Sequence, residues 1–140
     1  MLACLPSANP EELLYNWPDG RIKMFLTQRA LRFRRERADL FRRGEYLPLR
    51  VSGPLMECCV SFAQQLAGKW IVVIAPRLSS RVGFPPVGEL WKETAIEFPE
   101  ALSLKDAHDL FTCRPVRHKK RRVSVSDALS VLPFAAITNL

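Results

Sequence analysis

The sequence has no apolar run long enough to cross a membrane, and its few cysteines and histidines do not form a metal-binding pattern. A spanning helix needs ~18 consecutive apolar residues, and no run approaches that length. There is no CxxC pair, and neither His108 nor His118 lies at zinc-ligand spacing from a cysteine pair. We therefore expect a protein without a membrane segment, a metal or a cofactor.

The first residues and the cysteines together indicate the compartment. Residues 1–6 are too short for a secretory leader and carry no basic segment, so we expect no signal peptide. Cys58 and Cys59 are neighbours that would face opposite sides of a strand, so we expect no disulfide between them. With Cys4 and Cys113 they are interpreted as free thiols of a soluble, cytoplasmic protein, because disulfides are rare in reducing compartments.

The chain is also too short for a (β/α)8 barrel. It has 140 residues, whereas such a barrel needs roughly 200 to 250. A hydrophobic content of 48% is enough for one core of its own. Eleven prolines against six glycines suggest many short elements with rigid connections.

No pair of acidic residues suits glycosidic chemistry, which needs two carboxyl groups roughly 5 to 9.5 Å apart. Glu93 and Glu97 fall in a segment that is typical of a strand, which spaces them well apart on one face. Glu11 and Glu12 are adjacent on a terminal turn. Serine and cysteine nucleophiles lack a nearby histidine. We therefore assign no catalytic residue to this chain.

The net charge of +7 is concentrated in residues 29–43 and 114–122. Such stretches fit nucleic acid, anionic lipid or an acidic protein surface, or they are simply solvated. Glu36 and Asp39 interrupt the first stretch, and no nucleic-acid motif accompanies it, so nucleic acid is the less favoured partner. Residues 118–122 resemble a localisation signal or a phosphate-binding patch, but a solvated hairpin tip is the simpler interpretation.

A helical period begins at Arg21. The apolar stripe consists of Ile22, Phe25, Leu26, Ala30 and Phe33, and the opposite face carries Arg29, Arg32, Arg34, Arg35 and Arg37. We predict one long helix over residues 20–43, ended by Gly44, after a tail and turn over residues 1–19. Within that tail Asn9 and Pro10 are typical of a helix start.

After Gly44 the apolar pattern changes to period two. Strands are predicted around residues 46–51, 58–63, 70–75, 94–98, 109–112, 122–125 and 133–138, with a helical turn near 127–131. The run 70–75 is apolar throughout, as in a central strand buried on both faces. The predicted fold class is mainly β: an antiparallel β-sandwich over residues 44–140, preceded by a long N-terminal α-helix.

Two groups of residues are candidates for ligand binding. Asp19, Arg21 and Lys23 stand at the predicted helix start, where cations could hold an anionic or polyhydroxylated ligand; the alternative is a helix entry capped by Asp19. Trp70 and Trp91 could stack on sugar rings, or they are part of the core.

Several segments, taken in order, point to a known family. They are LLYNWPDGRIK (13–23), LRFRRERADLF (31–41), GEYLPL (44–49), VSFA (60–63), IVVIAPRL (71–78), WKET (91–94), DLFT (109–112) and LSVLPFAA (129–136). In order and spacing they resemble the C-terminal region of maltooligosyl trehalose synthases, which are isomerases of the α-amylase superfamily. The resemblance covers residues 10–140 and is most specific at residues 19–23 together with the arginine-rich helix that follows.

That resemblance implies a function for the whole enzyme that this chain does not contain. The family converts the terminal α-1,4 bond of a maltooligosaccharide to an α,α-1,1 bond, using carboxyl groups of a barrel that precedes the matched region. Residues 20–43 would correspond to the last barrel helix and residues 44–140 to the α-amylase-type C-terminal domain. Ile22, Phe25, Leu26 and Phe33 would then contact the barrel, and Asp19, Arg21 and Lys23 would border the maltooligosaccharide.

Three functional hypotheses follow. The first is a non-catalytic part of a trehalose-forming enzyme, whose partner is a catalytic barrel or, through the helix, a second copy of the chain. The second is an independent carbohydrate-binding module, favoured by exposed tryptophans. The third is a basic nucleic-acid-binding protein, favoured by an affinity that falls steeply with salt.

Overall fold

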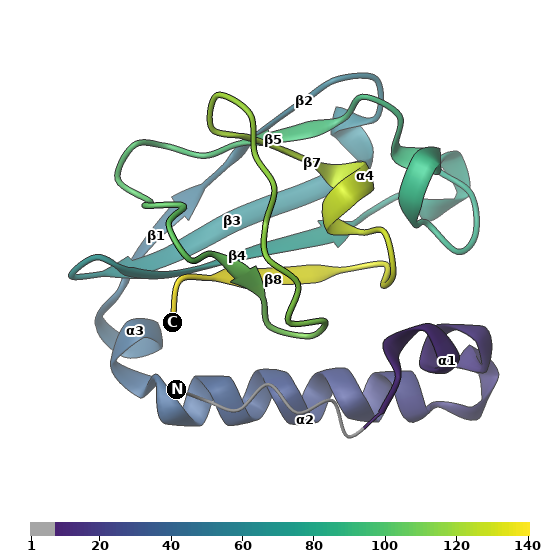
Figure 1. The fold of residues 1–140 in the computed structure, drawn as a ribbon, viewed down its shortest axis with the longest axis horizontal. Coiled ribbons are helices and arrows are strands. Elements are labelled where there is room, and N and C mark those ends of the chain that lie inside the picture. The colour runs from purple at the N-terminus through teal and green to yellow at the C-terminus, as the bar shows by residue number, and fades with distance from the viewer. Residues whose placement is uncertain (1–7) are drawn as a thin grey trace.

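The computed structural model describes residues 8–140, which form two antiparallel sheets and several helices (Figure 1). The helices of this part are α1 (Pro10–Tyr15), α2 (Arg21–Glu36), α3 (Ala38–Arg43) and α4 (Val125–Ala128), with the 3₁₀ turns η1 (Trp17–Asp19), η2 (Met56–Cys58), η3 (Ser79–Arg81) and η4 (Gly88–Trp91). The strands are β1 (Glu45–Pro48), β2 (Arg50–Ser52), β3 (Cys59–Leu66), β4 (Lys69–Pro76), β5 (Ala95–Glu97), β6 (His108–Asp109), β7 (Arg122–Ser124) and β8 (Ala135–Thr138).

The strands are divided between a large and a small sheet. The large sheet has the order β1-β3-β4-β8-β6 and the small one the order β2-β5-β7, with every pair antiparallel. Helix α2 runs along one side of the large sheet, and the small sheet lies on the other side (Figure 1). The result is three layers, with the large sheet in the middle.

The period of two along β4 explains why both faces of the large sheet are buried. Trp70, Val72 and Ile74 belong to the core shared with the small sheet. Ile71 points the other way, into the core shared with α2. Successive strand residues face opposite sides, so an unbroken apolar run is what a middle layer requires. The predicted doubly buried central strand is confirmed.

The predicted long helix is wrong, because two helices replace it. Helix α2 ends at Glu36, and Arg37 leaves the helical conformation with φ −118° and ψ 40°. Helix α3 follows and packs against β3. Neither proline nor glycine marks this break, so no local sequence signal predicts it. Tertiary packing decides it, since Phe33 before the break and Leu40 after it are buried in the same core.

The fold accordingly mixes α and β, and its two antiparallel sheets agree with the sandwich that was predicted. The antiparallel strands are confirmed in most places, with local shifts. The strand expected at 109–112 is only the short β6, because a turn begins after Asp109. The helical turn expected near 127–131 starts earlier, where the Ser124 hydroxyl accepts the N–H of Asp127 at the start of α4.

The thiols differ from one another. Cys58 and Cys59 are free and buried, and burial raises the pKa of the Cys59 thiol to about 12, so the thiolate does not form near neutral pH. Cys113 carries a disulfide in the structure, so the expectation of free thiols is wrong for that residue. Cys4 lies outside the described residues. Between residues 8 and 140, no helix has both the length and the apolar character of a membrane span.

Candidate functional site

Asp19 and Arg21 form a closed pair at the entrance to α2. One carboxylate oxygen of Asp19 accepts the backbone N–H of Arg21 at 2.9 Å, and the other accepts its Nε at 2.7 Å. These two bonds lower the pKa of Asp19, which is exposed. Gly20 between them has φ 79°, a conformation that favours glycine. Gly20 is thus the N-cap of α2 and has no side-chain cap, and the Asp19–Arg21 pair lies just before it. Lys23 is exposed in the first turn of the helix.

The apolar stripe of α2 faces the large sheet of this same chain. Phe25 and Phe33 are buried, and Ile22 and Leu26 pack beside them against Ile71 and its neighbours. Because Phe25 and Phe33 are already covered, their side chains are not available to a further domain. Ile22 and Leu26 are only half-buried, so a contact of α2 with a barrel would use these two or other residues of the helix.

Those other residues lie on the outward side of α2 and near its start. Met24 and Leu31 are seven residues apart, so they share one side of the helix, and their exposed fractions are 73% and 57%. At the helix entrance Trp17 meets Phe84 edge to face, with ring centroids 5.1 Å apart and both rings exposed. We call Trp17, Met24, Leu31 and Phe84 the outer apolar surface.

Sequence reasoning did not identify the outer apolar surface. Met24 and Leu31 sit beside the buried stripe in the helical pattern, so the sequence does not separate them from the core. Trp17 and Phe84 are far apart in the chain and meet only through the fold. The one local indication that Phe84 is exposed is the segment 83–88 around it, which contains two prolines and two glycines and is typical of an exposed connection.

The arginines of α2 do not share one solvated face. Arg29 turns toward the large sheet, where it donates to the Leu110 carbonyl at 3.3 Å and lies 4.9 Å from the Phe25 ring centroid. Burial lowers the pKa of Arg29. Arg32 remains outside and pairs with Glu36 at 3.0 Å. The prediction that Arg29 lies on the basic face is therefore wrong.

A cavity of about 390 Å³ lies where β6, β7, α4 and β8 approach one another. Two carboxylates, Asp109 and Asp127, are among its lining residues. Asp109 is buried, and its oxygens accept the N–H of Ala136 at 3.0 Å and the N–H and hydroxyl of Thr112 at 3.0 and 2.7 Å. Burial nevertheless raises the pKa of Asp109. Its oxygens are thus engaged in holding the chain, whereas Asp127 is exposed at the rim.

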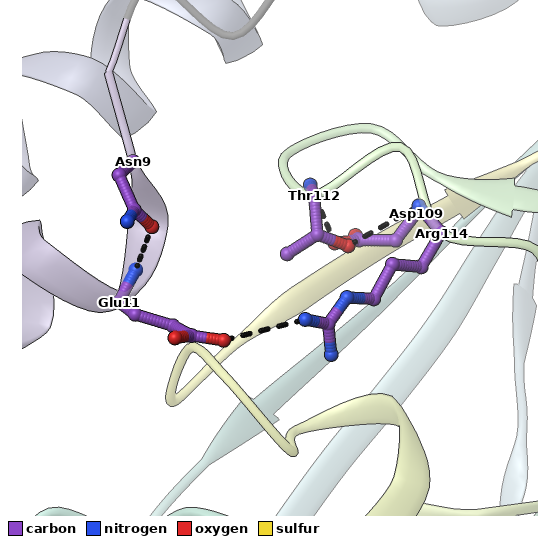
Figure 2. Close-up of polar contacts among 5 residues, drawn as sticks. All are labelled: Asn9, Glu11, Asp109, Thr112 and Arg114. Atoms are coloured by element: carbon purple, nitrogen blue, oxygen red, sulfur yellow. Dashed lines mark hydrogen bonds and ion pairs between the residues drawn. The ribbon is translucent and has the colours of Figure 1, made fainter.

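An exposed contact adjoins this cavity. Arg114 lines it and reaches Glu11 of α1 at 3.4 Å, beside the Asp109–Thr112 turn (Figure 2). Both partners are largely solvated, so the pair contributes little to stability. It ties the first described helix to the loop that follows β6.

Trp70 and Trp91 are fully buried, which removes the residues on which the carbohydrate-module hypothesis relied. The indole N–H of Trp70 donates to the Ser103 carbonyl at 3.1 Å, and that of Trp91 to the Pro86 carbonyl at 2.7 Å. Both rings are core residues with their one polar atom satisfied.

Residues 118–122 form the hairpin tip that the sequence suggested. Lys119 and Arg122 exchange backbone hydrogen bonds, both at 3.0 Å, and between them Lys120 and Arg121 have positive φ values of 49° and 61°. Among the described residues, no group of three or more histidine, cysteine or acidic side chains is placed to hold a metal ion.

Comparison with known proteins gives a structural match and no sequence match. No family model and no curated protein matches the sequence. A point mutant of maltooligosyltrehalose synthase from Arthrobacter ramosus shares the fold, with a TM-score of 0.59 and 22% identity over 91% of this chain. The matched part is 16% of that chain. The similarity agrees with the family resemblance seen in the sequence and is consistent with a C-terminal region.

Proposed function

We propose that this chain is a non-catalytic C-terminal domain or fragment of an enzyme like maltooligosyl trehalose synthase, where it supports a catalytic barrel. The observation that carries the proposal is the shared fold over 91% of the chain, together with a small share of the matched synthase. Because the matched region is only 16% of the synthase chain, the rest of that chain is long enough for a barrel.

The chemistry of the cavity supports a non-catalytic role. Glycosyl transfer needs one carboxyl group as acid and a second as nucleophile or base. Asp109 and Asp127 line one cavity, but the oxygens of Asp109 accept bonds from Thr112 and Ala136. A carboxylate whose two oxygens both accept such bonds holds a turn in place.

The outer apolar surface supports a docking role. Exposed apolar side chains can mark interaction sites. Met24 and Leu31 are exposed on α2, the element that corresponds to the last barrel helix in the resemblance, and the exposed Trp17–Phe84 pair includes a residue of the turn just before it. Arg21 and Lys23 lie within three residues of Met24, and the family resemblance implies that in the intact enzyme they would border the substrate cleft.

The proposal is tested by assaying the purified chain with maltopentaose. We expect no trehalose-capped product from the chain alone. Addition of a synthase barrel lacking its own C-terminal region should give a complex, and Met24→Glu with Leu31→Glu should abolish that complex without unfolding the chain. The matched control is Arg34→Glu with Arg35→Glu, exposed on the same helix. Product formed by the chain alone would overturn the proposal.

Self-association through the outer apolar surface is the second candidate. An uncovered apolar face of this kind can pair with its own copy. Sedimentation at increasing concentration distinguishes the two, because a dimer that persists in the presence of the barrel fragment would favour self-association. The same two glutamate substitutions should return that dimer to a monomer.

A further inference from the structure

We infer that the hairpin tip between β7 and the preceding loop, together with the outer edge of the small sheet, binds a compact phosphate-bearing ligand. The site is a hollow of about 400 Å³ lined by Lys119, Lys120 and Arg122, with Glu93 and the hydroxyl-bearing Ser124 beside them. This inference does not rest on the proposed function, since it concerns the opposite side of the molecule from α2.

The charge of the hollow favours an anion. The lining residues include three cations and one carboxylate, and Glu97 lies opposite Arg122 in the strand register. Within residues 8–140 neither Lys119 nor Lys120 makes an ion pair. Like charges held together repel one another. The fold gains nothing from this repulsion, but a bound phosphate would remove it.

The hairpin holds these cations in an unusual and costly conformation. Its two central residues, Lys120 and Arg121, both have positive φ, as in the turns where asparagine and glycine are preferred. The tip is nevertheless anchored. Arg121 donates to the carbonyls of Phe98 at 3.1 Å and Pro99 at 2.6 Å, and also to Leu102. The lysines are therefore carried on a fixed support, which reduces the entropy lost on binding.

Polar groups of the small sheet complete the hollow. Arg122 reaches across the sheet to the Ser52 hydroxyl at 2.9 Å, which orients its guanidinium. Ser124 accepts the N–H of Asp127, so its hydroxyl proton remains for a ligand oxygen. Guanidinium, ammonium and hydroxyl donors are the groups that recognise phosphate.

The shape of the protein argues against a nucleic acid as the ligand. A nucleic acid would need a continuous track of cations along its backbone. The other basic segment lies on α2, which runs along the far side of the large sheet from the small sheet and its hairpin (Figure 1). The two basic regions thus face opposite sides, and one strand cannot follow both.

The experiment is a titration of the full chain, followed by amide NMR shifts and calorimetry, with inorganic phosphate, glucose 6-phosphate and glucose. We expect saturable shifts at residues 93–95 and 119–124 with both phosphates and none with glucose. Tighter binding of glucose 6-phosphate would identify a sugar phosphate as the ligand, and equal binding would identify the phosphate group alone. No saturable shift up to ~20 mM phosphate, a concentration that detects even millimolar affinity, would overturn the inference.

Variants locate the binding. Lys119→Gln with Lys120→Gln should weaken phosphate binding at least about tenfold, or ~1.4 kcal/mol, and Arg122→Gln gives an independent test. The control Arg34→Gln with Arg35→Gln removes the same charge from α2 and should leave affinity unchanged. An equal loss of phosphate affinity in the lysine double variant and in the arginine control would mean that the attraction is non-specific, and it would overturn the inference. Tighter binding of a short DNA than of glucose 6-phosphate at the same salt would do so too.

Discussion

The carboxylate of Asp109 accepts both the hydroxyl and the backbone N–H of Thr112, at 2.7 and 3.0 Å. Its other oxygen accepts the N–H of Ala136 on β8, at 3.0 Å. One buried side chain therefore fixes the turn after β6 to the large sheet. A carboxylate beside a cavity resembles a catalytic group, but these bonds make it a structural one.

The first prediction concerns the pH dependence of Asp109. Burial raises its pKa above the ordinary value of 3.8, so the folded state binds its proton more tightly than the unfolded state. The stability that this proton binding contributes is complete below 3.8 and is lost as pH rises through the folded pKa. The free energy of unfolding of the native chain, minus that of Asp109→Asn, should therefore fall as pH rises from ~4 toward 7. Urea unfolding at several pH values measures it, and a difference that grows with pH would contradict the prediction.

The second prediction separates the two sides of α2. Phe33→Ala should lower the free energy of unfolding by ~3 to 5 kcal/mol, because a buried ring leaves a void. Leu31→Ala, two residues away but exposed, should change it by less than ~0.5 kcal/mol. Chemical denaturation of the two variants tests this. Similar losses of unfolding free energy in the two variants would mean that α2 is rotated about its axis so that Leu31 is also buried.

The third prediction tests the anchor of the hairpin. The planar guanidinium of Arg121 donates to several carbonyls of the 98–102 segment, a geometry that lysine cannot reproduce. Arg121→Lys should therefore cost ~1 to 3 kcal/mol by leaving acceptors unpaired. Arg117→Lys, exposed on the preceding loop, is the matched control and should be neutral. Thermal unfolding compares them, and equal melting temperatures would rule out the anchoring role.

The fourth prediction uses two glycines. A Cβ at Gly44 would lie 2.1 Å from the Leu40 carbonyl oxygen, so Gly44→Ala should displace α3 from β1 and cost at least ~1 to 3 kcal/mol. Gly68 has nothing within 4 Å but a φ of 79°, so Gly68→Ala carries only a conformational penalty of ~1 kcal/mol. The denaturant midpoints of the two variants show which substitution lowers stability more. A larger loss at Gly68 would mean that close approach is not the reason for Gly44.

Strand positions were predictable where side-chain pattern alone sets them. The run at residues 70–75 became β4, and alternation near residues 46–51 and 94–98 became β1, β2 and β5. The helix break at Arg37 was not predictable, because it follows from how Phe33 and Leu40 share one core. The same holds for Asp109, whose partners come from a turn and from a strand distant in sequence.

By itself the sequence determined the antiparallel strands, the amphipathic character of α2, the basic hairpin and the resemblance to a trehalose-forming family, since each is written in local pattern and spacing. Only the tertiary structure decided which face of α2 is covered, that Trp70 and Trp91 are core residues, and that Lys119, Lys120 and Arg122 border one hollow. The physical reason is that burial and charge proximity depend on which segments meet across the fold, and a periodic pattern records only that a face is apolar or charged, not what lies against it.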